Sequence, residues 1–409
     1  MLVNKKNTTG AGSSFDLLRE REAKVLMHTY GRYPLAVSRG AGSKLYDLDG
    51  REYTDLLAGI AVCALGHANP EVAEAIAEQA KKLVHVSNLF YQEDQVRLAE
   101  KLLATCGLDR VFFCNSGAEA NEGAIKLARR YQRKVKDSAA FEVVSLTGSF
   151  HGRTLATLTA TGQDKVKDGF DPLPAGFKHA PPNDLPALIA AVSTDTAAVM
   201  IEVVQAEGGV VLMDRDYLAG VQRLCRDADV LLIVDEVQTG LCRTGAWWAY
   251  QHFGLTPDIV TSAKALANGL PMGAVMASEE AAKGFSPGTH ATTFGGGPLL
   301  SRAAETVLTV MNRDKLAERA ALLGQKALAM FGRLQTEHPG KIAAVRGLGL
   351  LLGIELTGNG PAVWRALLDA GFIVNLAQDK VLRLVPALTV DESDLAAFAA
   401  ALDGILAGS

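Results

Sequence analysis

Short apolar runs alternate with segments of helical periodicity through the middle of the chain. The runs are 111–114 (VFFC), 141–146 (FEVVSL), 197–204 (AAVMIEVV), 230–236 (VLLIVDE) and 258–266 (DIVTSAKAL). Between the first two lies EANEGAIKLARRYQRK, which has the pattern of a helix. This alternation predicts an α/β domain with a largely parallel sheet. The strands are apolar throughout, as is typical when helices cover both faces of a sheet.

The pattern changes after the glycine-rich segment 294–298 (FGGGP). Long helices rich in Ala and Leu are followed by the strand-like segments 345–356 (VRGLGLLLGIEL) and 381–388 (VLRLVPAL), and then by a terminal helix. This part predicts a smaller α+β domain, joined by part of the N-terminal segment. We therefore expect residues 1–60 and 301–409 to form the small domain and residues 61–300 to form the large one.

Composition supports two linked domains and argues against several classes of partner. The chain has 409 residues, of which 48% are hydrophobic, more than one core usually supports. Its 41 basic and 45 acidic residues nearly balance, so we expect neither a nucleic acid nor a membrane as partner. The first residues, MLVNKKNTTGAGSS, lack the apolar stretch of a signal peptide, and no run reaches the roughly 18 residues of a membrane span. We expect a cytoplasmic protein with a loose N-terminus.

Cysteine and histidine positions give no sign of a disulfide framework or a metal site. The five cysteines are scattered and include no C-x-x-C pair, so we expect them to be reduced. The eight histidines lack the spacing of metal ligands, and we expect no metal.

Four clusters of small or polar residues follow the apolar runs, at the edge where open α/β sheets bind ligands. The first, 115–121 (NSGAEAN), joins an apolar run to a helix. Its small residues would let a phosphate approach free backbone N–H groups at the helix N-terminus. The segment also fits an ordinary cap, in which Ser116 and Glu119 form a capping box. Both interpretations stay open at this point.

The second cluster contains Phe150 and Arg153. The aromatic ring could stack on a planar cofactor, and the arginine offers a forked donor for a carboxylate. Taken separately, a core phenylalanine and a solvated arginine explain the two residues more simply.

The last two clusters contain Asp235 and Lys264. Asp235 ends a strongly apolar run, where a carboxylate needs a cationic partner such as a pyridinium nitrogen. A magnesium-binding acid of a nucleotidase is the alternative there. Lys264 lies between small and apolar neighbours, a setting that desolvates an amine and lets it attack an aldehyde. A single lysine, however, is more often a solvated surface residue.

The order and spacing of these clusters are more specific than any one of them. Together with 235–245 (DEVQTGLCRTG), 257–275 (PDIVTSAKALANGLPMGAV) and 289–299 (THATTFGGGPL), they resemble the class III, or ornithine-type, pyridoxal-phosphate aminotransferases. The resemblance extends from about Tyr33 to the last helix. It implies an α/β protein of PLP fold type I, with a mostly parallel seven-stranded sheet covered by helices and a smaller α+β domain from both termini.

The resemblance also implies pyridoxal 5'-phosphate as cofactor and a role for individual residues. Lys264 would hold the cofactor covalently and Asp235 would bind its ring nitrogen, and both would be catalytic. The other cofactor-binding residues would be Ser116, Gly117 and Ala118 at the phosphate, Phe150 on the ring, Gln238 at the phenolic oxygen, and Thr293 at the phosphate of the neighbouring subunit. The active sites would thus be shared in a homodimer.

Two positions depart from the pattern of the class. Ala118 stands where many members carry Thr, and Gly297 where many carry Asn. Ala118 can still offer its backbone N–H, but the hydroxyl contact is lost.

Three N-terminal segments bear on the substrate. Residues 58–62 (AGIAV), 65–70 (LGHANP) and 85–91 (HVSNLFY) look like those of the acetylornithine-type members of the class, which serve arginine biosynthesis. The implied reaction moves the δ-amino group of N2-acetylornithine to 2-oxoglutarate. Arg153 would bind the α-carboxylate of the donor, with Thr292 nearby. Ornithine, succinylornithine, succinyl-diaminopimelate and an acylated lysine analogue stay open as donors.

Glu207 and Arg383 match a pair that the class uses as a switch. With the pair closed, Arg383 is masked and an ω-amine reaches the cofactor; with the pair open, Arg383 binds the α-carboxylate of glutamate or 2-oxoglutarate. A fixed structural salt bridge is the alternative. The segment 202–206 (EVVQA) replaces the commoner E-P-I-Q-G, so the backbone of this loop is expected to differ.

Two other classes of protein are weaker interpretations. A nucleotide-binding ATPase fits the run 230–236, but the chain contains no G-x-x-x-x-G-K-[ST] motif. A dinucleotide-binding turn fits Gly347, Gly349 and Gly353, yet the residues that follow are typical of a strand and not of a helix.

Overall fold

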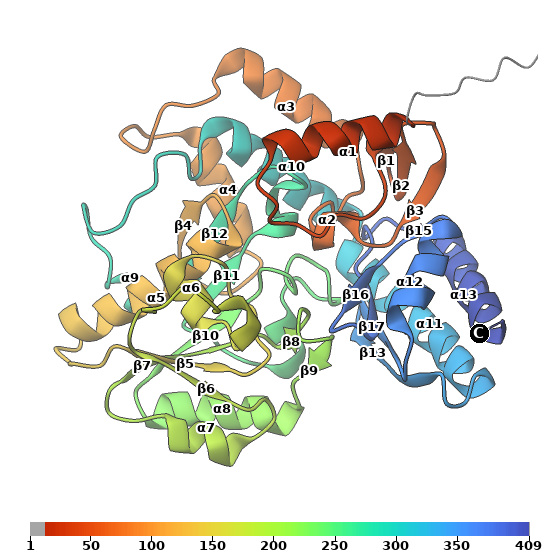
Figure 1. The fold of residues 1–409 in the computed structure, drawn as a ribbon. Coiled ribbons are helices and arrows are strands. Elements are labelled where there is room, and N and C mark those ends of the chain that lie inside the picture. Colours follow the sequence, from red (N-terminus) through yellow and green to blue (C-terminus); the bar gives the residue numbers. More distant parts are fainter. Residues whose placement is uncertain (1–12, 409) are drawn as a thin grey trace, which may run out of the picture.

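The structure, a computed structural model, describes residues 13–408, so the predicted loose N-terminus lies almost entirely outside the described residues. A seven-stranded sheet with the order β4-β12-β11-β10-β7-β5-β6 forms the centre of the larger part (Figure 1). Only β12 runs antiparallel to its neighbours, which confirms the predicted mostly parallel sheet. The strands are β4 (Arg110–Cys114), β5 (Glu142–Leu146), β6 (Phe177–Ala180), β7 (Thr196–Ile201), β10 (Leu231–Asp235), β11 (Ile259–Ser262) and β12 (Gly273–Ala277).

Both faces of this sheet are buried, which explains the continuous apolar runs. Successive residues of a strand point to opposite faces. Ala198 and Met200 accordingly belong to the core beneath α5 (Gly117–Lys134), whereas Val199 and Ile201 belong to the core on the other face, together with residues of α8 (Arg215–Asp227).

Further helices surround the sheet. α10 (Pro298–Arg313) packs against α3 (Pro70–Lys82) and α4 (Glu93–Leu103), and α7 (Leu185–Ala191) packs against α8. The remaining short elements of this part are α2 (Ala58–Ala61), α6 (Leu155–Ala160), α9 (Glu279–Ala282), β8 (Val204–Gln205), β9 (Val211–Leu212) and the 3-10 turns η1 (Asp164–Val166), η2 (Ala249–Phe253) and η3 (Lys264–Ala267). Within residues 13–408, no helix has both the length and the apolar character that crossing a membrane requires.

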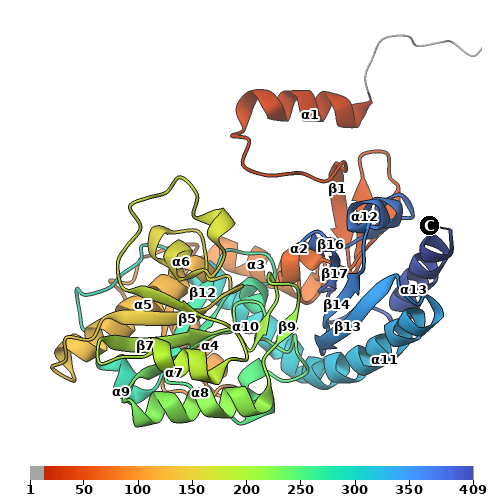
Figure 2. The same cartoon turned by 60° about the horizontal axis from the view of Figure 1, so that its bottom comes forward.

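The smaller part contains two four-stranded sheets and three helices beside the large sheet (Figure 2). One sheet has the order β1-β2-β3-β15 and the other the order β13-β14-β17-β16. Thr54 and Asp55 of β3 pair in parallel with Phe372 and Ile373 of β15, so both ends of the chain contribute to one sheet. The smaller domain from both termini is therefore as predicted, while the boundaries at residues 60 and 300 stay a prediction. Its elements are β1 (Val37–Ala41), β2 (Lys44–Asp47), β3 (Glu52–Asp55), β13 (Ile342–Leu348), β14 (Leu351–Leu356), β15 (Phe372–Ile373), β16 (Asn375–Ala377), β17 (Val381–Leu384), α11 (Leu316–Glu337), α12 (Gly360–Asp369) and α13 (Glu392–Ala407). Helix α1 (Ser14–Val25) buries none of its residues.

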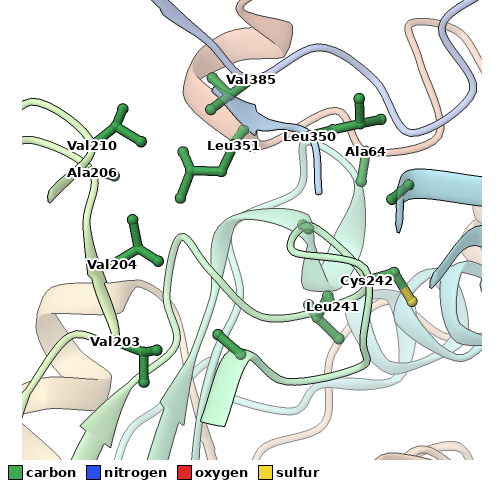
Figure 3. Close-up of a cluster of buried hydrophobic side chains, with 14 of the residues drawn as sticks. Ala64, Val203, Val204, Ala206, Val210, Leu241, Cys242, Leu350, Leu351 and Val385 are labelled. Atoms are coloured by element: carbon green, nitrogen blue, oxygen red, sulfur yellow. The ribbon is translucent and has the colours of Figure 1, made fainter. Parts of the chain in front are cut away.

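An apolar cluster joins the two parts of the chain (Figure 3). It combines loop residues beside the large sheet with residues of the C-terminal strands, and its labelled members are Ala64, Val203, Val204, Ala206, Val210, Leu241, Cys242, Leu350, Leu351 and Val385. Arg243 spans the same junction, since its Nη1 donates to the carbonyls of Leu350 (3.1 Å) and Pro386 (2.6 Å). The two parts therefore share a continuous packed core.

Two apolar segments differ from their prediction. The run 197–204 is not one strand, because β7 ends at Ile201 and the polar Glu202 separates it from β8. The run 258–266 is a strand only as far as Ser262, since Lys264 has a φ of 42° and begins the 3-10 turn η3. Residues 345–356 are strand-like as predicted and lie in the antiparallel hairpin β13–β14. The glycine turn is followed directly by strand β14 and not by a helix, which excludes the dinucleotide-binding turn.

Candidate active site

A cavity of ≈ 410 Å³ lies where β4, β7, β10 and β11 end. The residues along its wall come from six separate stretches of the sequence, because the carboxyl ends of parallel strands meet at one edge of the sheet. Those among them that were predicted as site residues are Ser116, Gly117, Ala118, Phe150, Arg153, Asp235, Gln238 and Lys264.

The turn between β4 and α5 is both a helix cap and an open N-terminus. The Ser116 hydroxyl accepts a hydrogen bond from the Glu119 N–H at 3.1 Å, and the Glu119 carboxylate accepts one from the Asn115 N–H at 2.7 Å. The N–H groups of Gly117 and Ala118 have no acceptor within the helix and lie at the cavity. The two interpretations of this segment are therefore compatible.

Asp235 is a buried carboxylate held by three donors. Its Oδ2 contacts Asn121 Nδ2 at 2.7 Å and His151 Nδ1 at 2.8 Å, and its Oδ1 accepts the N–H of Val237 at 3.0 Å. His151 Nε2 and Asn121 Oδ1 are buried and have no hydrogen-bond partner among the described residues. Sequence reasoning did not assign Asn121 or His151, although both lie inside the motifs NSGAEAN and FHGR that carried the resemblance.

Lys264 lies half-buried at the cavity, two residues after β11 ends. Burial lowers the pKa of its amine below the usual value, although the nearby charges of Glu207 and Asp235 oppose this shift. Among residues 13–408 its amine has no hydrogen-bond partner. A desolvated amine of this kind is a better nucleophile at neutral pH than a solvated one.

Arg383 and Glu207 form an ion pair beside the cavity. Arg383 Nη1 is 2.5 Å from Glu207 Oε1, and the arginine side chain is only 1% exposed, against 30% for the glutamate. Gln238 joins them, because its amide oxygen lies 3.3 Å from Arg383 Nη1 and its amide nitrogen 3.3 Å from Glu207 Oε1. Burial raises the pKa of Glu207, but the charge and hydrogen bond of Arg383 outweigh it and hold that pKa below its usual value.

The predicted residues Arg153, Thr292 and Thr293 lie farther out. Arg153 is exposed at the cavity, with its guanidinium carbon 5.5 Å from the centre of the Phe150 ring. Thr292 and Thr293 line a separate hollow of ≈ 810 Å³ that also includes Ser87 and Asn88. Within one chain the structure therefore does not bring the two threonines to the cavity that contains Lys264.

The family described as aminotransferase class III matches residues 25–406. The chain belongs to the class III aminotransferases. This family depends on pyridoxal phosphate, which is therefore the cofactor of this class III aminotransferase. The nucleotide-binding ATPase weighed from the run 230–236 is not supported.

Relatives with closely similar sequences bear one name. The acetylornithine aminotransferase of Methanocaldococcus jannaschii is 47% identical over 388 residues, which are 94% of this chain and 96% of that protein. The acetylornithine aminotransferase of Myxococcus xanthus is 45% identical over 392 residues, which are 95% of this chain and 97% of that protein. Among solved structures, the ornithine aminotransferase of Toxoplasma gondii ME49 has a TM-score of 0.93 and 32% sequence identity. The match covers 97% of this chain and 95% of that one. The acetylornithine aminotransferase of Elizabethkingia anophelis has a TM-score of 0.86, 31% identity and coverage of 97% and 99%. These matches confirm the predicted PLP type I fold.

The residues at the cavity fit pyridoxal phosphate. A phosphate needs hydrogen-bond donors, and the first N–H groups of α5 are free to supply them. A pyridinium ring needs a flat apolar neighbour and an acid, which Phe150 and Asp235 provide. An aldehyde needs an amine, and Lys264 is the lysine that lines the cavity.

Proposed function

We propose that this class III aminotransferase transfers the δ-amino group of N2-acetylornithine to 2-oxoglutarate. The products are N-acetylglutamate 5-semialdehyde and glutamate, and the reaction serves arginine biosynthesis. The single observation that carries the proposal is the placement of Lys264 and Asp235 at one cavity, with the Arg383–Glu207 pair hydrogen-bonded to Gln238 in its wall. The relatives named acetylornithine aminotransferase, at 43–48% identity, support this donor.

The cofactor would be held by residues of several segments. The backbone of Ser116, Gly117 and Ala118 would bind its phosphate, and Phe150 would cover one face of its ring. Asp235 would bind the ring nitrogen, and Gln238 the phenolic oxygen. The three donors to Asp235 support this role, because they fix its carboxyl group at the cavity where the ring nitrogen would lie.

When bound, pyridoxal phosphate supplies a carbonyl carbon for the amine and a ring that accepts an electron pair. Lys264 then does the acid–base work. Its amine would take a proton from the δ-carbon of the bound donor and hold it until the proton is returned. Burial, which lowers its pKa, supports this assignment because a neutral amine is needed to accept a proton.

Substrate selection would depend on two arginines. Arg153 would hold the α-carboxylate of acetylornithine, near Thr292, while Glu207 masks Arg383 and lets the δ-amine reach the cofactor. With glutamate or 2-oxoglutarate, the Glu207–Arg383 pair would open and Arg383 would take the α-carboxylate. The half-exposed position of Glu207, against the buried Arg383, supports the glutamate as the part that moves.

A homodimer with shared active sites would complete this arrangement. Thr293 of each chain would reach the cofactor phosphate of the other. Two observations support this: the threonines line a hollow away from their own cavity, and large apolar residues beside that hollow are exposed. The exposed fractions of these residues are 87% for Leu89, 61% for Phe90, 106% for Tyr91 and 62% for Phe294.

The five cysteines are all free thiols, four of them buried, which supports a reducing compartment such as the cytoplasm.

Replacing Lys264 with Ala tests the assignment of the catalytic lysine. We expect Lys264→Ala to lose turnover and the visible absorption of the bound cofactor, and to show no cofactor mass on the protein after borohydride reduction. Lys283→Ala is the matched control, since that lysine is exposed and, within residues 13–408, forms its ion pair with Glu280 alone. Retained turnover without an added amine, or covalent cofactor on another lysine, would overturn the assignment.

A further inference from the structure

Glu202 is a second buried carboxyl at the base of the cavity. It follows β7 directly, and the register of the neighbouring strands pairs Ile201 with Val234, which places Glu202 beside Asp235. Both side chains therefore point to the α5 face of the sheet. Glu202 is 5% exposed and lines the cavity together with Phe150 and Lys264.

The two neighbouring carboxyls have unequal surroundings. Asp235 has three hydrogen-bond donors, one of them the imidazole of His151. Glu202 has one, the backbone N–H of Phe150, which its Oε2 accepts at 3.0 Å. Within residues 13–408, no lysine, arginine or histidine forms an ion pair with Glu202.

Two buried carboxyls on neighbouring strands repel each other when both are charged, which favours a proton on one of them. Glu202, which has a single donor and no ion-pair partner within residues 13–408, is the one that takes the proton. Burial, reinforced by the charge of Asp235, raises the pKa of Glu202 well above its usual value. Glu207 acts in the same direction, while the Phe150 N–H and the amine of Lys264 oppose the shift without reversing it.

We propose that Glu202 is a positioning residue that works as a neutral carboxylic acid. One of its oxygens fixes the backbone of Phe150, and its neutral state keeps a second negative charge away from Asp235. This inference rests on the proposed roles of Phe150 and Asp235 towards the cofactor. It goes beyond them because it assigns a protonation state and a task to a residue outside the predicted site.

Replacing a neutral carboxylic acid with an amide preserves its interactions, whereas replacing a charged carboxylate with an amide removes the charge. Glutamine keeps the acceptor for the Phe150 N–H and a donor in place of the acid proton, and it carries no charge. Glu202→Gln therefore preserves every interaction of a neutral acid. Glu202→Ala leaves the partly buried N–H of Phe150 without its acceptor, a loss that corresponds to about 5- to 150-fold in an equilibrium constant.

The experiment combines cofactor titration with infrared spectroscopy. Apoenzyme is titrated with pyridoxal phosphate while tryptophan fluorescence is followed, and we expect less than about threefold weakening for Glu202→Gln and at least about fivefold for Glu202→Ala. The infrared difference between wild type and Glu202→Gln at neutral pH should contain the carbonyl band of a protonated carboxylic acid. Neither readout requires an amino donor, so a failure of the proposed transamination would leave this test intact.

Glu236 provides a matched control. It is as deeply buried, at 1% exposure, and burial raises its pKa to about 7. Its carboxyl group accepts the N–H of Tyr250 at 2.9 Å and the hydroxyl of Thr239, and it does not line the cavity, so it shares the burial of Glu202 without the contact to Phe150. Glu236→Gln should leave the band assigned to Glu202 in place. The proposal is wrong if the infrared difference between wild type and Glu202→Gln shows only an ionised carboxylate. It is also wrong if Glu202→Gln weakens cofactor binding at least fivefold. If Glu202→Ala fails to fold, the glutamine variant alone decides in the same way.

Discussion

Replacing Glu207 with Gln separates a switching ion pair from a fixed one. In the switch, a dicarboxylate has to displace Glu207 before Arg383 can bind it, so removing the glutamate charge unmasks the arginine. A hydrogen bond to a charged group contributes about 1.5–3 kcal/mol, and each 1.36 kcal/mol is tenfold in affinity. Because the Glu207 side chain is 30% exposed, water screens the ion pair, and we expect the lower end of this energy range. A dicarboxylate should therefore bind Glu207→Gln about tenfold more tightly than wild type.

Glutarate is the probe for this measurement, since it is a five-carbon dicarboxylate that cannot be transaminated. Its dissociation constant is measured by calorimetry on wild-type holoenzyme and on Glu207→Gln, together with the free energy of unfolding. Glu305→Gln is the control, because Glu305 is buried and pairs with Lys101 at 3.0 Å away from the cavity. Unchanged glutarate affinity, accompanied by reduced stability in Glu207→Gln, would refute the switch and leave a fixed salt bridge.

Three further predictions address other positions. Ala118→Thr restores the hydroxyl common in the class and should slow cofactor dissociation by up to about tenfold; an unchanged rate would argue against a phosphate at this turn. Gly297, the N-cap of α10, has no side-chain cap, so Gly297→Asn should raise the free energy of unfolding by a few tenths of a kcal/mol in a urea titration, and a loss would contradict the capping argument. The hydrogen bond to Asp55 raises the pKa of His67 to about 10. The stability from this pair, at most about 5 kcal/mol, should be complete below about pH 6.5 and disappear as the pH rises through about 10. The free energy of unfolding of His67→Gln should lack this decline with pH. The same pH dependence in wild type and His67→Gln would contradict the prediction.

The large sheet and most of the cofactor site could be predicted from the sequence because both depend on local patterns. Continuous apolar runs mark strands buried on both faces, and Lys264 and Asp235 follow such runs directly. The limits of the runs were less predictable. Glu202 continues an apolar run in sequence, yet its carboxyl needs polar partners and lies beyond the end of β7.

Contacts between distant segments could not be read from the pattern. The pairing of Thr54 with Phe372 joins strands more than three hundred positions apart, and nothing in either segment specifies the other. The same holds for His151 and Asn121, whose importance comes from a shared partner, Asp235. Polar residues in a motif reveal their role only when the fold brings their partners to them.

The half-reaction of the holoenzyme with single amino donors tests the proposed function most directly. Purified holoenzyme is mixed with acetylornithine, ornithine, succinylornithine, succinyl-diaminopimelate or an acylated lysine, and the loss of the visible cofactor band is timed without any keto acid. We predict that acetylornithine reacts fastest and that 2-oxoglutarate restores the band. Comparable rates for ornithine and acetylornithine would contradict the proposed donor, and no spectral change with any ω-amine would contradict the proposed reaction.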